Sequence, residues 1–296
     1  MSGVTVFCFV ASYAVALALE VAGLWVRFGW HRLAMVVMAV AGLVAHSWFL
    51  ASHSMDDVAI LGSPENWYLV VAWVLAASYL WVVFTAPNTA MGLFVLPLVL
   101  LVIAIGEGAS HEPFAAQQAS KLWSNLHGVF MMLATVTVCV GFLAGLMYLI
   151  QSWRLKRKVP SSREFQLPSL EWLERTNSRA LGLSAILVAG GFISGLILSR
   201  IVHGGEANYR LLADPVVLSL LFMLLWLVAA ELFRMVYPSA RVGRKVAYLT
   251  LASFGFLVIT LIVFSSNAIH GSPPPRDTTA QLSTAADRTT SGEVWQ

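Results

Sequence analysis

The sequence predicts an all-α, polytopic membrane protein, a bundle of about eight transmembrane helices with the N-terminus and the C-terminus outside. Apolar residues make up 58% of the 296 residues and charged residues only 11%, whereas about 25% of an average soluble domain is charged. The apolar residues gather in runs that reach the roughly 20 residues needed to cross a bilayer core. Basic residues concentrate in alternate joints between these runs, as the positive-inside rule requires.

Eight segments have the length and composition of a membrane span. In chain order they are 4–26, 33–53, 67–85, 90–106, 124–153, 178–203, 215–237 and 242–269. The first begins almost at Met1 without a basic leader or a small-residue cleavage site, so we expect a retained span and not a removed signal peptide. The fourth is the shortest, because it is interrupted by Pro97 and follows closely on the third.

The distribution of Lys and Arg predicts the orientation. With the N-terminus outside, thirteen of the 18 basic residues fall in the inner joints. The remaining five, Lys121, Arg200, Arg210, Arg276 and Arg288, then fall outside. Removing one span would invert every later joint and place the basic cluster at 154–179 outside, against the positive-inside rule.

Two segments outside the spans have their own expected structure. In the inner joint 154–179, Leu170, Trp172 and Leu173 lie among charged residues, which predicts either a short interfacial helix or a polar loop anchored by the tryptophan. The tail 272–296 is rich in Pro, Ser and Thr, and we expect it to be disordered on the non-cytoplasmic side. Residues 1–271 are therefore expected to form a single transmembrane domain.

The seven histidines are unevenly distributed, because six of them lie in the outer half of the predicted membrane or beyond it. His127 opens the fifth span and His270 closes the eighth, so both are expected at the same outer depth. Neutral imidazole suits haem iron, and two imidazoles can bind one iron from opposite faces. The alternative is a pair of interfacial histidines bonded to water or to a carbonyl. Histidines in the outer joints, such as His111, are expected to be solvated.

Other polar residues at membrane depth have competing explanations. His46 either bonds to a neighbouring helix or is functional, and Glu20 either makes an interhelical hydrogen bond or lines a proton or cation path. Glu231 is placed to pair with the arginine three residues on, and Asp214 before a proline is typical of a helix N-cap. Two glycine pairs have the spacing that permits close helix contact, Gly141 with Gly145 and Gly191 with Gly195.

The composition does not predict a nucleic-acid surface, since the net charge is only +3 and the basic residues lie in the joints. The two cysteines, Cys8 and Cys139, lie inside apolar runs, so a disulfide framework is not expected.

Two stretches resemble segments of the cytochrome c assembly family of membrane proteins. They are the fifth span, LHGVFMMLATVTVCVGFLAGLMYLIQSWRLK, and the stretch LPSLEWLERTNSRALGLSAILVAGGFISGLI. The resemblance covers about 124–272, and the HemX-like branch is the closer match. It implies that His127 and His270, the latter in AIHGS, are the outer haem ligands.

Family members that attach haem to cytochrome c carry a tryptophan-rich outer segment ending in Trp-Asp-Pro. The corresponding stretch here is ANYRLLADPVV, in which Asp214 and Pro215 remain and the tryptophans are gone. A further histidine of some synthases corresponds to Arg234. The resemblance therefore implies a role in haem-related assembly or regulation, and neither synthase activity nor a stand-alone enzyme is expected.

The expected function is binding or handling of b-type, non-covalent haem in cytochrome c assembly or related haem biogenesis, with the iron bound by His127 and His270. Asp214, Arg210 and His46 are further candidate haem contacts, and Arg210 is placed to pair a propionate. Expected partners are membrane lipid, haem, a second cytochrome c assembly membrane subunit and apocytochrome c. The expected location is the bacterial inner membrane, with a thylakoid membrane as the alternative. Two other classes stay open, a small-molecule or proton-coupled transporter and a cofactor-free assembly or regulatory subunit.

Overall fold

A computed structural model describes most of the chain. The described residues are 5–25, 30–54, 61–85, 89–111, 114, 120–158, 166–202, 214–237 and 243–270, of which 53–54, 202 and 267–270 are described as backbone alone. All regular structure within these ranges is α-helical. The expected tail and the candidate contact Arg210 lie outside the described residues.

Each predicted span corresponds to one helix. In chain order the helices are α1 (Val6–Ala22), α2 (His31–Ser54), α3 (Pro64–Thr85), α4 (Gly92–Glu107), α6 (Lys121–Lys156), α7 (Leu170–Val202), α8 (Pro215–Val236) and α9 (Arg244–His270). Six of them are long and apolar enough to cross a membrane. The two shorter ones are α1 with 17 residues and α4 with 16, which confirms that the fourth predicted span is the shortest. The predicted polytopic helix bundle is thereby confirmed.

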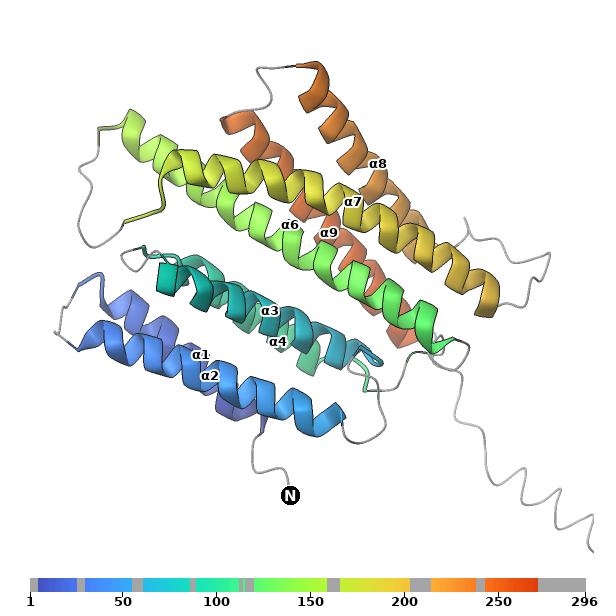
Figure 1. The fold of residues 1–296 in the computed structure, drawn as a ribbon, viewed down its shortest axis with the longest axis horizontal. Coiled ribbons are helices and arrows are strands. Elements are labelled where there is room, and N and C mark those ends of the chain that lie inside the picture. The colour runs from blue at the N-terminus through green and yellow to red at the C-terminus, as the bar shows by residue number, and fades with distance from the viewer. Residues whose placement is uncertain are drawn as a thin grey trace, which may run out of the picture.

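The helices form two halves, α1 to α4 and α6 to α9, which lie side by side with their axes roughly aligned (Figure 1). The halves meet where α3 lies against α6. At one end the Ala90 N–H donates to the Gln166 carbonyl over 2.8 Å. At the other end the hydroxyl oxygens of Tyr68 and Ser265 lie 3.2 Å apart. Polar contacts therefore join the halves at both ends of the bundle.

The expected interfacial helix or polar loop at 170–179 is wrong, because α7 runs without a break from Leu170 to Val202. The hydroxyl of Ser169 accepts from the Trp172 N–H at 3.2 Å, which caps the start of the helix. Leu173 and Asn177, one turn apart, are 0% and 1% exposed, so the buried face of the helix already exists in this segment. The charged residues around them occupy the other faces of the same helix.

Close helix contacts in the C-terminal half depend on glycine and on one buried amide. A Cβ at Gly141 would lie 3.1 Å from the Cβ of Ala180, which confirms the expected role of this glycine pair. With its amide in the orientation that satisfies both its oxygen and its nitrogen, Asn177 donates to the Gly141 carbonyl at 3.2 Å and to Thr250 Oγ1 at 2.8 Å, and accepts from Ala247 N–H at 3.2 Å. One side chain of α7 is therefore bonded to both α6 and α9.

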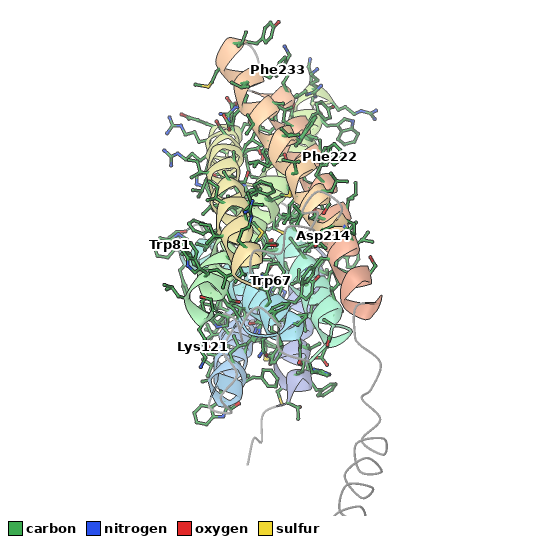
Figure 2. The ribbon with its side chains drawn as sticks, turned by 90° about the vertical axis from the view of Figure 1, so that its right-hand side faces the viewer. Trp67, Trp81, Lys121, Asp214, Phe222 and Phe233 are labelled. Carbon is green, nitrogen blue, oxygen red and sulfur yellow. The ribbon has the colours of Figure 1, made fainter. Side chains whose placement is uncertain are left out.

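The outer surface of the bundle is apolar, as expected for helices in contact with lipid. Figure 2 shows Phe222 and Phe233 on the outer side of α8, where they are 56% and 41% exposed. Only 17% of the most apolar window of α8 is buried, compared with 56% for α3. The lipid-facing surface therefore includes most of α8, whereas α3 lies mainly inside the bundle.

Candidate functional site

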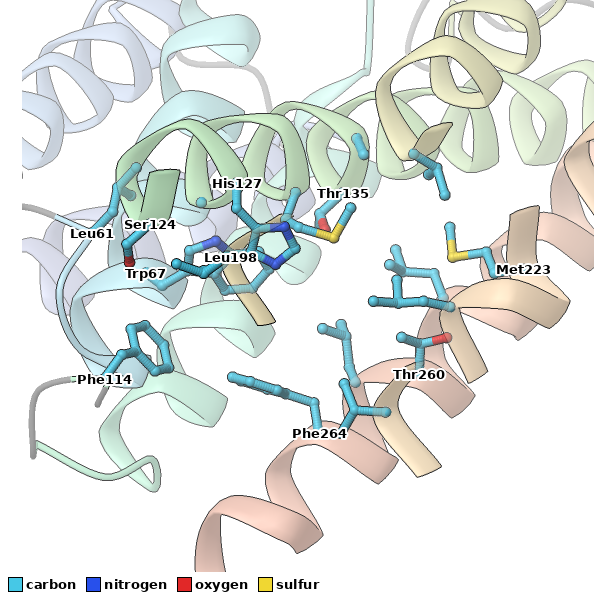
Figure 3. A pocket seen from close by; sticks show the side chains of 18 residues that line it. Leu61, Trp67, Phe114, Ser124, His127, Thr135, Leu198, Met223, Thr260 and Phe264 are labelled. Atoms are coloured by element: carbon cyan, nitrogen blue, oxygen red, sulfur yellow. The ribbon is translucent and has the colours of Figure 1, made fainter. Parts of the chain in front are cut away.

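A cavity of about 280 Å³ lies among α3, α6, α7, α8 and α9, at the end of the bundle where α6 begins (Figure 3). Four polar side chains reach its wall: Ser124, His127, Thr135 and Thr260. The other lining residues are apolar or aromatic, apart from a glycine. An apolar wall with a few placed polar groups is typical of a site for a small molecule or cofactor.

The start of α6 directs His127 to this cavity. The hydroxyl of Ser120 accepts from the Trp123 N–H at 3.5 Å, so the helix begins at Lys121. Residues three or four apart share a face of a helix, and those lining the cavity from α6 follow this spacing: Ser124, His127, Gly128, Met131, Ala134 and Thr135. His127 is the imidazole on that face.

The imidazole of His127 is held by the backbone of α7. Its Nδ1 lies 2.8 Å from the carbonyl oxygen of Gly191. A carbonyl can only accept, so Nδ1 carries the proton and the neutral ring keeps the Nε2 lone pair. Among the described residues, no hydrogen bond to Nε2 is formed. Metal-ligating histidines are commonly held by such a bond from the other ring nitrogen, so the arrangement suits Nε2 ligation.

The N-terminal half closes one side of the cavity. Leu61, Trp67 and Phe114 all contribute to the wall. The Phe114 N–H donates to the Gly62 carbonyl at 2.7 Å, and its ring lies 6.1 Å from that of Phe264. The cavity therefore requires both halves of the bundle.

His270 is the last residue of α9, and its side chain is outside what the structure describes. The preceding turns of α9 line the cavity through Leu257, Leu261 and Phe264. The last turns of α9 and the first turns of α6 therefore lie at the same end of the bundle, as expected from the sequence. Whether the two imidazoles face one another stays a prediction.

Asp214 lies at this end of the bundle as the N-cap of α8. Its Oδ1 accepts from the Val216 N–H at 2.8 Å, and Pro215 follows at the start of the helix. The N-cap expectation is confirmed. Val216 itself lines the cavity, so the Asp214 carboxylate is close to the cavity wall along the chain.

His46 is not brought to the cavity. Its side chain is 0% exposed in the N-terminal half, where its ring stacks on Phe9 with centroids 4.2 Å apart. Its Nδ1 lies 3.5 Å from the Tyr13 hydroxyl. These contacts with α1 favour the first explanation, a histidine bonded to a neighbouring helix.

The comparison with known families gives one match. The family model described as Cytochrome C assembly protein matches residues 32–271, from the start of α2 to just beyond α9. The chain belongs to the cytochrome c assembly protein family. Membership supports a role in cytochrome c biogenesis, in a family associated with haem handling. No curated protein and no solved structure matched the chain.

In this cytochrome c assembly protein, Glu20 lies where α1 meets the start of α4. Its carboxyl contacts the Gly92 backbone N–H. The Glu20 Cδ and the Tyr79 hydroxyl oxygen each lie 3.0 Å from the position that a Gly92 Cβ would take. Met91, the N-cap of α4, provides no side-chain hydrogen bond. A carboxyl group near a helix N-terminus is stabilising, so the contact favours the interhelical hydrogen bond as the explanation of Glu20.

Two further charged residues pair as the sequence predicted. Arg234 donates to Glu231 at 2.6 Å, which confirms the expected pair. Arg234 also donates to the Ser178 carbonyl at 3.2 Å. The position at which some family synthases carry a histidine is thus an arginine that joins α8 to α7.

Several features of the site had no signal in the sequence. His111 is solvated as expected, with 74% of its side chain exposed, and its Nδ1 also bonds to the Glu65 carboxylate. This bond and the charges of Glu65 and Glu107 raise the pKa of His111 above its usual value. The contact between His127 and Gly191 spans 64 residues. Neither partner could be identified from spacing, because each contact joins residues that are distant in the sequence.

Proposed function

We propose that this protein binds haem non-covalently in the His127 cavity, as a step in cytochrome c assembly or related haem biogenesis. The observation that carries the proposal is the hydrogen bond from His127 Nδ1 to the Gly191 carbonyl, which leaves Nε2 as the ligating atom. Bound haem supplies an iron centre whose potential depends on its axial ligands. The protein would supply one axial imidazole and an apolar enclosure.

The residues present fit a tetrapyrrole better than a bare metal ion. Within the described part of the chain, no three His, Cys, Asp or Glu side chains lie close enough to hold a metal. A porphyrin brings four nitrogen donors, so axial imidazoles alone complete the coordination. The cavity of about 280 Å³ is near the lower limit of small-molecule pockets, roughly 300–1,000 Å³. It would therefore enclose part of a haem-sized ligand.

We propose His270 as the second axial ligand, and Arg210 and Asp214 as contacts of the polar edge of haem. The support for His270 is the end of α9 beside the cavity; the support for Asp214 is its place beside Val216. Arg210 rests on the sequence alone. His46 would contact haem only after α1 and α2 separate, because Phe9 covers its ring.

The family branch, the membrane and the partners of the protein are further parts of the proposal. We propose that the chain is of the HemX-like type, that it lies in the bacterial inner membrane, and that it works beside a second assembly subunit and apocytochrome c. The absence of the tryptophan-rich segment from the sequence supports assembly or regulation, in place of haem attachment by this chain.

The visible spectrum of the full-length protein, purified from haem-replete cells, tests the proposal. We expect a Soret band that is lost or shifted in His127→Ala and in His270→Ala. His31→Ala is the control, because His31 contacts the Leu19 carbonyl at the opposite end of the bundle. A parent protein without a Soret band, or a band indifferent to His127→Ala, would show that the cavity does not bind haem through this residue. The first result would favour the cofactor-free subunit, and the second would favour a haem site elsewhere in the protein.

A further inference from the structure

The surface of α7 that faces His127 is built from three residues on one helix face. Ser194 and Gly195 lie three and four positions after Gly191, which places all three residues on one face of the helix. The Ser194 side chain is 3% exposed, and its hydroxyl donates to the Gly191 carbonyl at 3.0 Å. The same hydroxyl oxygen lies 3.5 Å from His127 Nδ1. The Gly191 carbonyl therefore accepts from both His127 and Ser194.

Gly195 provides the space in which the imidazole lies. A Cβ at this position would be 2.9 Å from His127 Cε1 and 3.1 Å from Nδ1. Such distances are shorter than ordinary contacts of a Cβ atom. The ring could not occupy its observed position beside any larger residue.

We infer that Gly191, Ser194 and Gly195 position His127, fixing the proton on Nδ1 and presenting the Nε2 lone pair before any ligand binds. These three residues are called the α7 seat. The inference rests on the proposed function only for the identity of the ligand. A ring turned by 180° about its last side-chain bond would place a carbon against the Gly191 carbonyl and lose the hydrogen bond. The seat therefore selects both a tautomer and a ring orientation.

The seat also affects how strongly the imidazole donates electrons to a bound metal. A hydrogen bond from the non-ligating nitrogen raises the basicity of a histidine ligand. Ser194 shares the acceptor, which weakens the bond that His127 makes to it. Removing the Ser194 hydroxyl would strengthen the remaining bond, make the imidazole more electron-rich and stabilise the oxidised iron. The structure thus assigns Ser194 a tuning role without direct contact to the ligand.

The tautomer can be measured without haem. Solid-state ¹⁵N NMR of haem-free, histidine-labelled protein in lipid bilayers should show His127 with a protonated Nδ1 and a bare Nε2. The resonances are assigned by their loss in His127→Ala. A protonated Nε2, or an average of the two tautomers, would overturn the inference. This signal in a protein that shows no Soret band would defeat the haem proposal and leave the seat in place.

Gly195→Ala and Gly190→Ala form a matched pair. A Cβ at Gly190 would lie 2.8 Å from Phe130 Cε1, so both variants press a methyl group against an α6 ring, but only one touches His127. We expect Gly195→Ala to lose the protonated Nδ1 signal and to weaken or shift the Soret band, while Gly190→Ala keeps both. Circular dichroism and size-exclusion chromatography check folding. Equal effects of the two variants on the imidazole would overturn the positioning role.

Ser194→Ala tests the tuning step. We expect the variant to keep the Soret band and the tautomer and to have a more negative haem midpoint potential than the parent. A merely structural hydroxyl would leave the potential unchanged, and that result, or a more positive potential, would overturn the role assigned to Ser194.

Discussion

His127 and His111 show how the partner of an imidazole decides its chemistry. His127 donates to a neutral carbonyl, which adds no charge and leaves a lone pair available. His111 bonds to the carboxylate of Glu65, which favours the protonated ring. Both side chains lie at the same end of the bundle, yet one is suited to hold a metal and the other to titrate.

The pair of His111 and Glu65 predicts a pH dependence of stability. The folded state raises the pKa of His111, so its contribution is complete below the unfolded pKa of about 6.5 and is lost as the pH rises through the raised value. Because the His111 side chain is 74% exposed, we expect the pair of His111 and Glu65 to contribute less than about 1 kcal/mol to the free energy of unfolding. Thermal unfolding in detergent from pH 6 to pH 9 measures it. In Glu65→Gln this part of the pH dependence should disappear; an unchanged profile would contradict the assignment.

The contact of Glu20 with the start of α4 predicts that substituting Glu20 changes the stability of that helix end and not the transport of protons. Glu20→Gln keeps the shape of the side chain and removes its charge from the start of α4, which should destabilise that helix end by roughly 1 kcal/mol. Hydrogen exchange of the first-turn amides of α4 should become faster, and exposed Glu171→Gln should leave them unchanged. Proton flux in reconstituted vesicles that depended on Glu20 would instead favour the transporter.

At the scale of helices, Asn177 connects α7 to α6 and α9 through three hydrogen bonds. Ala247 lies at the end of the first turn of α9. The Asn177 oxygen therefore adds an acceptor from another helix at the start of α9. A polar residue in such a place stabilises the packing because each of its bonds is made.

Asn177→Leu should lower the free energy of unfolding by about 1–3 kcal/mol, because it removes the three hydrogen bonds that the buried Asn177 amide makes. Arg175→Ala is the comparison, since Arg175 makes an exposed ion pair with Glu171 on the same helix and should cost far less. Chemical unfolding in mixed micelles measures both variants. Similar midpoints for the two would show that the Asn177 bonds do not stabilise the bundle.

The helices could be predicted from the sequence because each membrane span is a long apolar run, and short polar joints separate one run from the next. The start of α7 could not, since Leu173 and Asn177 belong to a buried face that is hidden among charged residues. His127 was identified from its place at the start of a span. Its partners Gly191 and Gly195 were recognised only as a packing pair, because the sequence does not state which side chain fills the space between helices.

At the scale of the whole molecule, the cavity depends on the docking of the two halves. Trp67 and Phe114 complete a wall that otherwise belongs to α6, α7, α8 and α9. The family match from 32 to 271 spans both sides of that contact. The N-terminal half therefore contributes to the candidate site through α3 and the segments at Leu61 and Phe114, although His127 and His270 both come from the C-terminal half.

The orientation of the bundle decides on which side of the membrane the cavity lies. In the predicted topology, thirteen of the 18 basic residues fall in the joints on the side of the membrane away from the start of α6, and such residues favour the cytoplasmic side. With Cys8→Ser as the background, Ser110→Cys marks the His127 end and Glu171→Cys marks the other, both at exposed positions. A membrane-impermeant maleimide should label Ser110→Cys in intact cells and Glu171→Cys only after lysis. The reverse pattern would place the His127 cavity at the cytoplasmic face, where haem would have to be supplied from the inside of the cell.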